Sequence, residues 1–323
     1  MNPAHGMKSI YRFGVDLGGT KTEAVLLDPH GQAIWGQRLP TPRGDYRGSL
    51  EQIAGLLGAA RKAHPHAAEC SVGLGIPGSL DEQGIVRNAN STWLIGQAMK
   101  NDLQTLLGQP VAIANDANCL AMSEAADGAG EGFSCVFAVI LGTGVGAGLV
   151  MNGKLWEGAG GLAGEWGHVS LPWPRSDWDE IPGPQCWCSR NACIECFLSG
   201  PALARDAGRG DGDAQAALKH AGAAAALERF YDRLARALAM VINIIDPQVI
   251  VLGGGLSQLE AIYQQIPARW QNWVFSNRKP NTLLRPAKHG DASGVRGAAW
   301  LLESFEGPSG PDAASRAGEF LTP

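Results

Sequence analysis

The sequence predicts an α/β protein with two domains, and three observations support this prediction. The chain has 323 residues, roughly twice the length of a common domain. Apolar runs typical of strands alternate along it with amphipathic patterns typical of helices. The order strand, glycine-rich turn, strand, tight turn, strand occurs twice, once near the beginning and again from residue 135. We interpret this repetition as a duplication of organisation, not of individual residues.

The composition is that of a globular protein with a sizeable core. Apolar residues make up 45% of the chain and charged residues 18%. The net charge is −5 and no block of basic residues occurs, which argues against nucleic acid as a partner. No apolar run reaches the roughly 18 residues of a membrane span, and the first residues lack the apolar core of a signal peptide. We therefore expect a cytoplasmic protein without a membrane partner.

The first part of the chain is predicted to alternate strands with two helices. Leu50, Ile53 and Leu57 recur at helical spacing. The residues Asp28-Pro29-His30-Gly31 form a turn signal between two strand-like runs. We predict strands over residues 9–18, 20–28, 32–40, 70–78 and 110–116, and helices over residues 46–64 and 117–129.

The remainder restarts the same pattern. Asn152-Gly153 is a pair that favours a two-residue hairpin turn. Leu234 and Leu238 lie on the apolar side of a long helical pattern that Pro247 ends. We predict strands over residues 135–144, 146–151, 154–158 and 248–257, and helices over residues 226–246 and 294–305.

The stretch FGVDLGGTKTEAVLLD places a glycine-rich turn between two strands. Its spacing fits neither a dinucleotide-binding G-x-G-x-x-G turn nor a P-loop. A tight hairpin can still turn backbone N–H groups toward phosphate, with Gly18 and Gly19 permitting close approach and Thr20 and Lys21 adding a hydroxyl and a cation. Asp16, at the strand end, could hold Mg²⁺ directly or through water. The alternative, a hairpin that binds nothing, stays open on this stretch alone.

Two further glycine-rich turns follow strands. Glycine weakens a strand and usually indicates that something approaches the backbone closely. We therefore expect the first two hairpins to hold the phosphates of a nucleotide from both sides, and the third turn to lie against its adenosine. The residues concerned in the second and third turns are Gly142, Thr143, Gly144, Gly253, Gly254 and Gly255.

Four of the seven cysteines lie in CWCSRNACIEC. The C-x-C-x₄-C spacing of Cys186, Cys188 and Cys193 predicts three ligands of a tetrahedral zinc site. Cys196, three residues after Cys193 and thus about one helical turn further on, is one candidate for the fourth ligand. The alternative is a set of reduced thiols without metal.

Six motifs occur in the order DLGGTK, NDAN, LGTGVG, GEWGH, CWCSRNACIE and VLGGG. Over about residues 10–305 the chain thereby resembles the ROK family of sugar kinases, within the actin/hexokinase-like ATPase superfamily. NANSTW, ANDANCLA and KHGDASGVRGAAWL resemble most closely its bacterial fructokinase/mannokinase branch. The resemblance implies a two-domain actin/hexokinase-like (ribonuclease H-like) α/β fold with ATP and sugar in the cleft between the domains.

The resemblance also implies a division of the chain in which the C-terminal helix returns to the first domain. We place an extension at residues 1–8, a small domain at residues 9–117 together with about 290–305, a large domain with the zinc loop at residues 118–289, and a flexible tail at residues 306–323.

Asp116 lies between a predicted strand and a predicted helix. On these residues alone, an ordinary helix cap is the favoured interpretation. The resemblance implies instead that Asp116 is the general base, which accepts the proton of the sugar hydroxyl as that hydroxyl attacks the γ-phosphate of ATP. Carboxylates and amides suit sugar hydroxyls, and the resemblance implies a sugar site of Gly78, Asn90, Asn115, Asp116, Glu165, His168 and Glu195. Trp93 and Trp166 are candidates to flank the sugar.

The family pattern supplies His168 as the fourth zinc ligand, in competition with Cys196. That pattern is usually C-x-C-G-x-x-G-C-x-E, and here Ser189 and Ala192 replace both glycines. If these positions require positive φ, each replacement costs about 1 kcal/mol. Zinc ligation is worth on the order of 10 kcal/mol, so we expect the loop to persist around a structural zinc.

The function expected from the resemblance is phosphorylation of fructose to fructose 6-phosphate with Mg²⁺ and ATP, with mannose as a weaker substrate. The alternative within the family is a kinase for N-acetylglucosamine or glucose. A further alternative is a non-catalytic sugar-sensing regulator; the family's repressors carry a helix-turn-helix segment before the kinase-like body, for which we expect no room before DLGGTK. The sequence leaves the oligomeric state open, with a homodimer as the assembly we consider.

Overall fold

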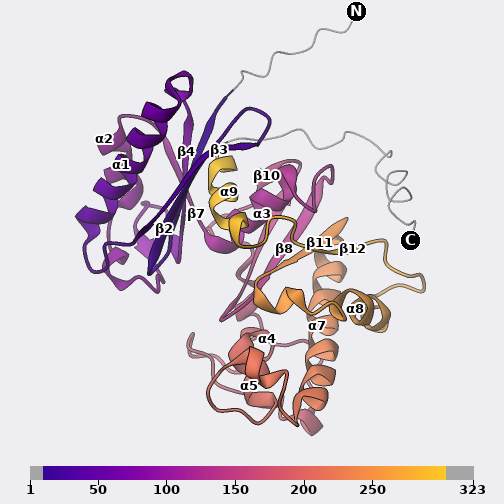
Figure 1. Cartoon of the computed structure of the whole chain (residues 1–323). Helices are drawn as coiled ribbons and strands as arrows, with labels where there is room; N and C mark the ends of the chain where they lie inside the picture. The colour runs from indigo at the N-terminus through magenta and orange to yellow at the C-terminus, as the bar shows by residue number, and fades with distance from the viewer. Residues whose placement is uncertain (1–9, 303–323) are drawn as a thin grey trace, which may run out of the picture.

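The computed structural model describes residues 10–302. Two five-stranded sheets lie in separate lobes, with helices between and around them (Figure 1). The predicted extension at residues 1–8 and the predicted tail at residues 306–323 lie outside the described residues. This architecture confirms the expected α/β class with two separate sheets.

The first sheet has the strand order β3-β2-β1-β4-β7. Its first three strands in the chain form an antiparallel meander, and the other two continue it in parallel. Helices α1 and α2 lie on one side of this sheet (Figure 1). The elements are β1 (Arg12–Leu17), β2 (Lys21–Leu27), β3 (Ala33–Pro40), β4 (Ser71–Ile76), β7 (Val111–Asn115), α1 (Tyr46–Ala63) and α2 (Met99–Leu107).

The second sheet repeats this plan in the order β10-β9-β8-β11-β12. Its meander is again antiparallel, and its last two strands again run parallel to the first. The predicted duplication of organisation is therefore confirmed. The elements are β8 (Cys135–Leu141), β9 (Val145–Met151), β10 (Lys154–Leu155), β11 (Val249–Gly253), β12 (Leu283–Pro286), α7 (Ala223–Ile245) and α8 (Ile262–Trp270).

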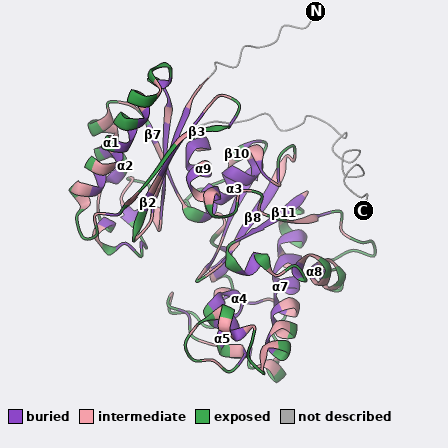
Figure 2. Ribbon diagram, in the orientation of Figure 1, coloured by how far each residue is buried: buried purple, intermediate pink, exposed green. Residues whose placement is uncertain are grey.

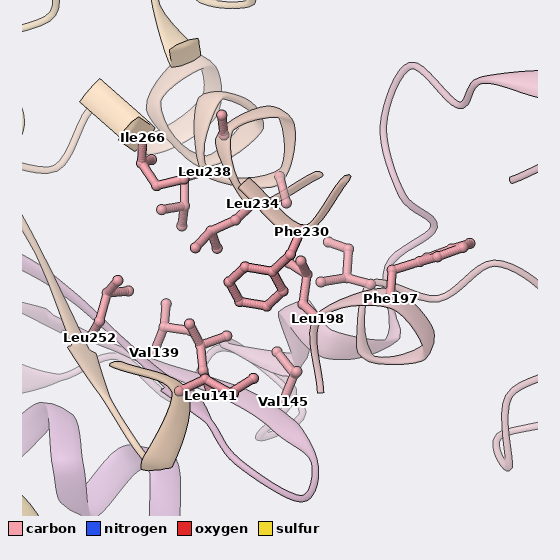
Figure 3. Close-up of a cluster of buried hydrophobic side chains, with 14 of the residues drawn as sticks. Val139, Leu141, Val145, Phe197, Leu198, Phe230, Leu234, Leu238, Leu252 and Ile266 are labelled. Atoms are coloured by element: carbon pink, nitrogen blue, oxygen red, sulfur yellow. The ribbon is translucent and has the colours of Figure 1, made fainter. Parts of the chain in front are cut away.

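The long helix α7 packs its apolar face on the second sheet. Phe230, Leu234 and Leu238 are fully buried and lie over Leu141 and Leu252 (Figure 3). Residues 233–239 in the middle of α7 are all buried, whereas the first turns of the helix include exposed residues (Figure 2). Side chains of this size contribute roughly 1.5–3 kcal/mol each when buried. The helix ends at Ile245, just before Pro247, as predicted.

Two helices lie between the sheets, α3 (Asp116–Asp127) and α9 (Ser293–Trp300) (Figure 1). Their close contact requires glycine: a Cβ on Gly297 would lie 1.7 Å from the Cys119 carbonyl oxygen. A Cβ on Gly73 of β4 would lie 1.8 Å from the Ala298 carbonyl oxygen. The C-terminal helix is thereby packed onto the first sheet and, through α3, against the start of the second.

Several predicted boundaries need correction. The final helix was predicted over residues 294–305, but α9 ends at Trp300, where Leu301 donates to the Ala298 carbonyl in a tighter turn. Residues 303–305 are not described. Several elements were not predicted from the sequence: α2, α8, β12, the short strands β5 (Ser79–Leu80) and β6 (Val86–Arg87), and the short helices α4 (Glu195–Leu198), α5 (Gly200–Asp206) and α6 (Ala214–Ala217).

Buried charges fix the segment that leads into the cysteine loop. Glu180 is 1% exposed and accepts hydrogen bonds from Arg233 at 2.7 Å and Arg236 at 2.8 Å, both on α7. The two guanidinium groups hold the pKa of the Glu180 carboxyl below its ordinary value, against the opposing effect of burial. Removing one partner of such a network is strongly destabilising, because a charge is left buried without compensation.

Among the described helices, none combines the length and the apolar character needed to cross a membrane.

Candidate functional site

The turn between β1 and β2 is held rigidly from both sides. The Gly18 N–H donates to the Lys21 carbonyl at 3.0 Å. Thr41 braces the turn from outside: its hydroxyl donates to the Gly18 carbonyl at 2.8 Å and its N–H to the Thr20 carbonyl at 3.0 Å. The side chains of Thr20 and Lys21 stay exposed. The turn can therefore offer a hydroxyl and an ammonium group to an anion without rearranging its backbone.

The glycines of these turns were expected to mark the approach of a ligand, but three of them have a packing reason. A Cβ on Gly254, whose φ is 82°, would lie 2.5 Å from the Leu141 carbonyl oxygen. A Cβ on Gly253 would lie 2.9 Å from Leu120. For Gly18 the obstacle is the Lys21 carbonyl within the same turn, also at 2.9 Å. Packing alone therefore accounts for glycine at these three positions.

Three other glycines do border open space. A Cβ on Gly19 would meet no described atom closer than 3.6 Å, one on Gly142 none closer than 3.9 Å, and one on Gly255 none within 4 Å. Because β8 and β11 are parallel neighbours, the turns that contain Gly142 and Gly255 leave the same edge of the second sheet. Thr143, the residue that follows Gly142, is exposed. These positions leave room for a ligand next to the backbone, and the predicted nucleotide contacts there stay a prediction.

Asp116 does not cap helix α3, contrary to the interpretation that its sequence context favours. The N-cap is Asn115, whose Oδ1 accepts the Asn118 N–H at 2.7 Å. Asp116 is the first residue of the helix, and its Oδ1 accepts the Ala117 N–H at 2.8 Å. Its carboxylate is exposed to solvent. The helix is thus capped without Asp116, which leaves the second carboxylate oxygen available for chemistry.

Asp16 and Asp116 lie close enough to influence each other's ionisation. Burial at the end of β1, followed by the charge of Asp116, raises the pKa of Asp16 to about 6. Loss of hydration raises the pKa of Asp116 as well, although solvent reaches that side chain. Cys119 is fully buried near both carboxylates. Two carboxylates that share a poorly hydrated site favour a cation between or beside them.

The motif GEWGH forms the 3₁₀ turn Glu165–His168, pressed onto β9. A Cβ on Gly164 would lie 2.3 Å from the Ala147 carbonyl oxygen, and one on Gly167 would lie 2.0 Å from the Val145 carbonyl oxygen. Both glycines are therefore required for this packing. Glu165 is exposed at the start of the turn, and His168 is half-buried at its end.

The expected stacking tryptophans pack elsewhere. Trp166 is 5% exposed, and its ring packs edge-to-face on Phe137 in the core of the second lobe. Trp93 packs against the core of the first lobe. Both were weighed as candidates to flank the sugar, and this role is wrong for Trp166, which is buried.

A cavity of about 570 Å³ opens beside Asn115. Its walls come from residues 79–84, from α2, from Asn115 and Asn118, and from the glycine-rich loop 157–161. Among the described residues of the predicted sugar site, Asn115 is the one in its wall; Glu165, His168 and Glu195 are not. The cavity thus adjoins the predicted site at Asn115.

Two other predicted sugar residues, Gly78 and Asn90, lie between β4 and α2. A Cβ on Gly78 would lie 2.8 Å from the Arg87 carbonyl oxygen, so glycine lets these chains approach. The Asn90 N–H donates to the Pro77 carbonyl at 3.2 Å, and its side chain is exposed. The structure therefore gives Gly78 a packing role and leaves Asn90 free to face a ligand.

Four side chains converge in the cysteine loop. The ligand atoms of His168, Cys186, Cys188 and Cys193 all lie within 4.8 Å of one another. The Cys188 and Cys193 Sγ atoms are 3.6 Å apart, and His168 Nδ1 lies 3.6 Å from Cys186 Sγ. Tetrahedral zinc with Zn–S bonds of about 2.3 Å requires S···S distances of about 3.8 Å. The donor set and its spacing therefore fit a closed structural zinc site.

The backbone of this loop keeps left-handed conformations at both positions where the family has glycine. φ is 72° at Ser189 and 56° at Ala192. Each non-glycine residue in this region costs roughly 1–2 kcal/mol. Ser189 and Ala192 thus adopt the positive φ that was considered for these positions, with its cost in strain, and the zinc itself stays a prediction.

Glu195 joins the cysteine loop to the second glycine hairpin. Its Oε2 accepts the Val145 N–H at 2.9 Å, and its Oε1 accepts the indole N–H of Trp187 at 2.7 Å. Trp187 was not among the residues predicted to belong to the site. Its place between two predicted zinc ligands was the sequence signal that could have identified it.

Comparisons with known proteins identify the family of the chain. The model of the ROK family matches residues 12–304. An N-acetyl-D-glucosamine kinase of Yersinia enterocolitica is 40% identical in an alignment of 309 positions that covers 90% of this chain and 98% of that protein. Relatives of the same name from Pectobacterium, other Yersinia and Vibrio are 36–38% identical with the same coverage.

Solved structures of ROK family sugar kinases share the fold of this chain. A ROK hexokinase from Thermus thermophilus superposes with a TM-score of 0.77 at 28% identity, covering 90% of this chain and 97% of that one. A ROK family glucokinase from Streptomyces griseus, solved with glucose and AMPPNP, has a TM-score of 0.70 at 26% identity and covers 90% and 98%.

The fold and the site define an ATP-dependent sugar kinase of the actin/hexokinase-like class. The chain belongs to the ROK family. The relatives compared above are named N-acetyl-D-glucosamine kinases, whereas the shorter motifs predicted a fructokinase.

Proposed function

We propose that this protein transfers the γ-phosphoryl group of ATP to the 6-hydroxyl of N-acetyl-D-glucosamine. The sugar is chosen because relatives with 36–40% identity along nearly their whole length carry that activity in their names. Fructose, with mannose as a weaker substrate, is the second candidate, and the motif NANSTW supports it. Glucose has the support of the solved glucokinase.

The observation that carries the reaction itself is the position of Asp116. It stands first in α3, where the dipole of the helix favours the ionised carboxylate. Asn115 takes the capping role, so the second oxygen of Asp116 can accept the proton of the 6-hydroxyl. The oxygen then attacks the γ-phosphorus as the bond to ADP breaks. General-base help of this kind contributes typically 10²–10⁴-fold to the rate.

The other residues position the reactants. Thr20, Lys21 and Thr143 carry exposed polar groups on the two glycine hairpins, where they would contact the phosphates. Asp16 would hold Mg²⁺, which neutralises charge on the β- and γ-phosphates when bound. Gly19, Gly142 and Gly255 leave room for the nucleotide. The ring hydroxyls of the sugar would be bound by the exposed or half-buried polar residues Asn90, Asn115, Glu165, His168 and Glu195.

We also propose that His168, Cys186, Cys188 and Cys193 hold a structural zinc ion. His168 is favoured over Cys196 as the fourth ligand because its Nδ1 belongs to the converging set and the Cys196 thiol does not. All four positions of a tetrahedral ion are then filled by protein, so the ion has no open site for chemistry. Its role is to fix the loop that carries Glu195 and the turn that carries His168.

The test is turnover of the purified full-length chain with Mg-ATP and a panel of sugars. ADP release is measured with N-acetylglucosamine, glucose, mannose and fructose, and the product is identified by NMR. We expect N-acetylglucosamine to give the highest kcat/KM and a 6-phosphate product. A higher kcat/KM with fructose would overturn the proposed substrate in favour of the second candidate, and absence of turnover with all four would overturn the proposed activity.

A further inference from the structure

Trp187 occupies an unusual position between two proposed metal ligands. It lies between Cys186 and Cys188 in the sequence, and 68% of its surface is exposed. A single exposed aromatic side chain is by itself common and needs no explanation. What sets Trp187 apart is that both ends of its side chain contact residues of the proposed sugar site.

The polar end of Trp187 holds Glu195. The indole N–H donates to Oε1 at 2.7 Å, while Oε2 accepts the Val145 N–H at 2.9 Å. Hydrogen bonds to a charged acceptor are about twice as strong as neutral ones. With both oxygens engaged, the Glu195 carboxylate has one fixed orientation, and each oxygen retains a lone pair for a sugar hydroxyl.

The ring of Trp187 lies against the second of these residues. Its centroid is 4.8 Å from that of His168, and the two planes meet at 87°. His168 directs Nδ1 toward Cys186. The indole of Trp187 therefore contacts both His168 and Glu195, and the rest of its apolar surface is open to solvent.

We propose that Trp187 is a positioning and specificity residue of the sugar site. Its indole N–H orients Glu195, and its exposed ring packs on the acetamido group of an N-acetylated hexose. An acetamido group offers a flat amide and a methyl group, which suit an aromatic face. Glucose offers a hydroxyl at the same carbon and gains nothing from that face. This inference rests on the proposed function.

Two variants separate the two roles. Trp187→Phe keeps an aromatic ring but removes the N–H donor, and Trp187→Ala removes both. For Trp187→Phe, kcat/KM for N-acetylglucosamine and for glucose should both fall about tenfold, as expected for loss of a hydrogen bond to a charged group. For Trp187→Ala, a further fall of roughly fivefold should affect N-acetylglucosamine alone. The KM for ATP should change less than twofold.

Matched controls exclude a general effect. Trp173 is also exposed, and its ring stacks on that of Trp273 with the centroids 5.3 Å apart. Trp173→Phe and Trp173→Ala should leave both sugar constants unchanged. Zinc content should be equal in all variants, which shows that the loop is still formed.

Binding without ATP gives an independent readout. N-acetylglucosamine should change the tryptophan fluorescence of the native protein and of Trp173→Phe, and this change should be absent in Trp187→Phe. Values of kcat/KM for N-acetylglucosamine and glucose that stay within twofold of the native values in both Trp187 variants would overturn the inference. An equal loss for both sugars in Trp187→Ala would overturn the role of the ring. If the native chain prefers another hexose, the proposed function fails, while Trp187→Phe assayed with that hexose still tests the role of the N–H donor.

Discussion

The carboxylate of Glu195 accepts a hydrogen bond from the backbone N–H of Val145 at 2.9 Å. Glu195 begins the helix that follows the proposed zinc loop, and Val145 begins the strand that follows the second glycine hairpin. One bond therefore connects the part of the site assigned to sugar with the part assigned to phosphate. The predictions below test this connection and the roles of the residues around it.

Gly144→Ala should disturb both parts at once. A Cβ at this position would lie 2.8 Å from Glu195 Oε2, which forces the carboxylate or the hairpin to move. Because a functional site tolerates only about 0.5 Å of misplacement, we expect the KM values for sugar and for ATP both to rise, by at least about fivefold. Gly58→Ala on the outer face of α1, where a Cβ meets nothing within 4 Å, is the control and should retain native kinetics. Unchanged KM values for sugar and ATP in Gly144→Ala would show that the site does not require the close contact between Gly144 and the Glu195 carboxylate.

Asp16→Asn should make the protein more stable and less active. The folded pKa of Asp16 is raised from 3.8 to about 6, so the folded state binds its proton more tightly than the unfolded state does. Stability from this group is therefore present at low pH and declines as pH rises between about 4 and 6. Near pH 7, without Mg-ATP, the asparagine variant should gain on the order of 1 kcal/mol of unfolding free energy, while its KM for Mg-ATP rises. Denaturant melts near pH 7 and near pH 4 check the sign: the gain should vanish at the lower pH, and a gain of equal size at both would contradict this explanation.

Loss of the metal should impair sugar use more than ATP binding. Elemental analysis should first find about one zinc per chain. Cys188→Ala, or removal of zinc by a chelator, should raise the sugar KM and lower kcat, because the turn with His168 and the loop with Glu195 lose their common anchor. Binding of ATP, measured by calorimetry, should change much less. A metal-free protein with full activity would refute this coupling.

The fourth ligand can be identified separately. His168→Ala should lose zinc, and Cys196→Ala should retain it, since His168 Nδ1 lies in the converging set and the Cys196 thiol does not. The reverse pattern would assign a four-cysteine site.

Ser189→Gly should stabilise the cysteine loop. Ser189 has φ of 72°, where glycine relieves backbone strain of about 1 kcal/mol, partly offset by the greater freedom of glycine in the unfolded chain. Thermal unfolding of the zinc-loaded protein should show a small rise in Tm. Arg190→Gly, at a neighbouring position outside the left-handed region, is the matched control and should lower the Tm. A lower Tm in Ser189→Gly would contradict the account of strain.

Much of this fold was predictable because the strands carry strong local signals. Asn152-Gly153 forms the predicted tight turn with φ of 51° and 71°, and Pro247 ends α7 as predicted. Helices α2 and α8 were missed because their few buried residues make short patterns, and α8 even contains Pro267. The twofold repetition of the sheet was visible since each meander has a glycine-rich turn of its own.

The site was predicted less completely, because packing and ligand binding both select glycine. Gly254 and Gly167 are required by the backbones that they contact, and no sequence pattern separates them from Gly255, which borders open space. The convergence of His168 with three cysteines depends on the contact of its turn with β9. It was predicted only through the family resemblance, because no local spacing indicates it. The contact between Trp187 and Glu195 spans a loop with no regular spacing, so only the structure reveals it.

The most direct test of the account is the turnover of Asp116→Asn with N-acetylglucosamine and Mg-ATP. Asparagine keeps the size of the side chain and its bond to the Ala117 N–H, but it cannot accept the proton of the 6-hydroxyl. Since Asn115 caps α3, folding should be intact and the Kd for the sugar within about threefold of the native value. We predict that kcat falls by at least about 10²-fold. Turnover near the native rate, with the sugar still phosphorylated at the 6-position, would contradict the role assigned to Asp116.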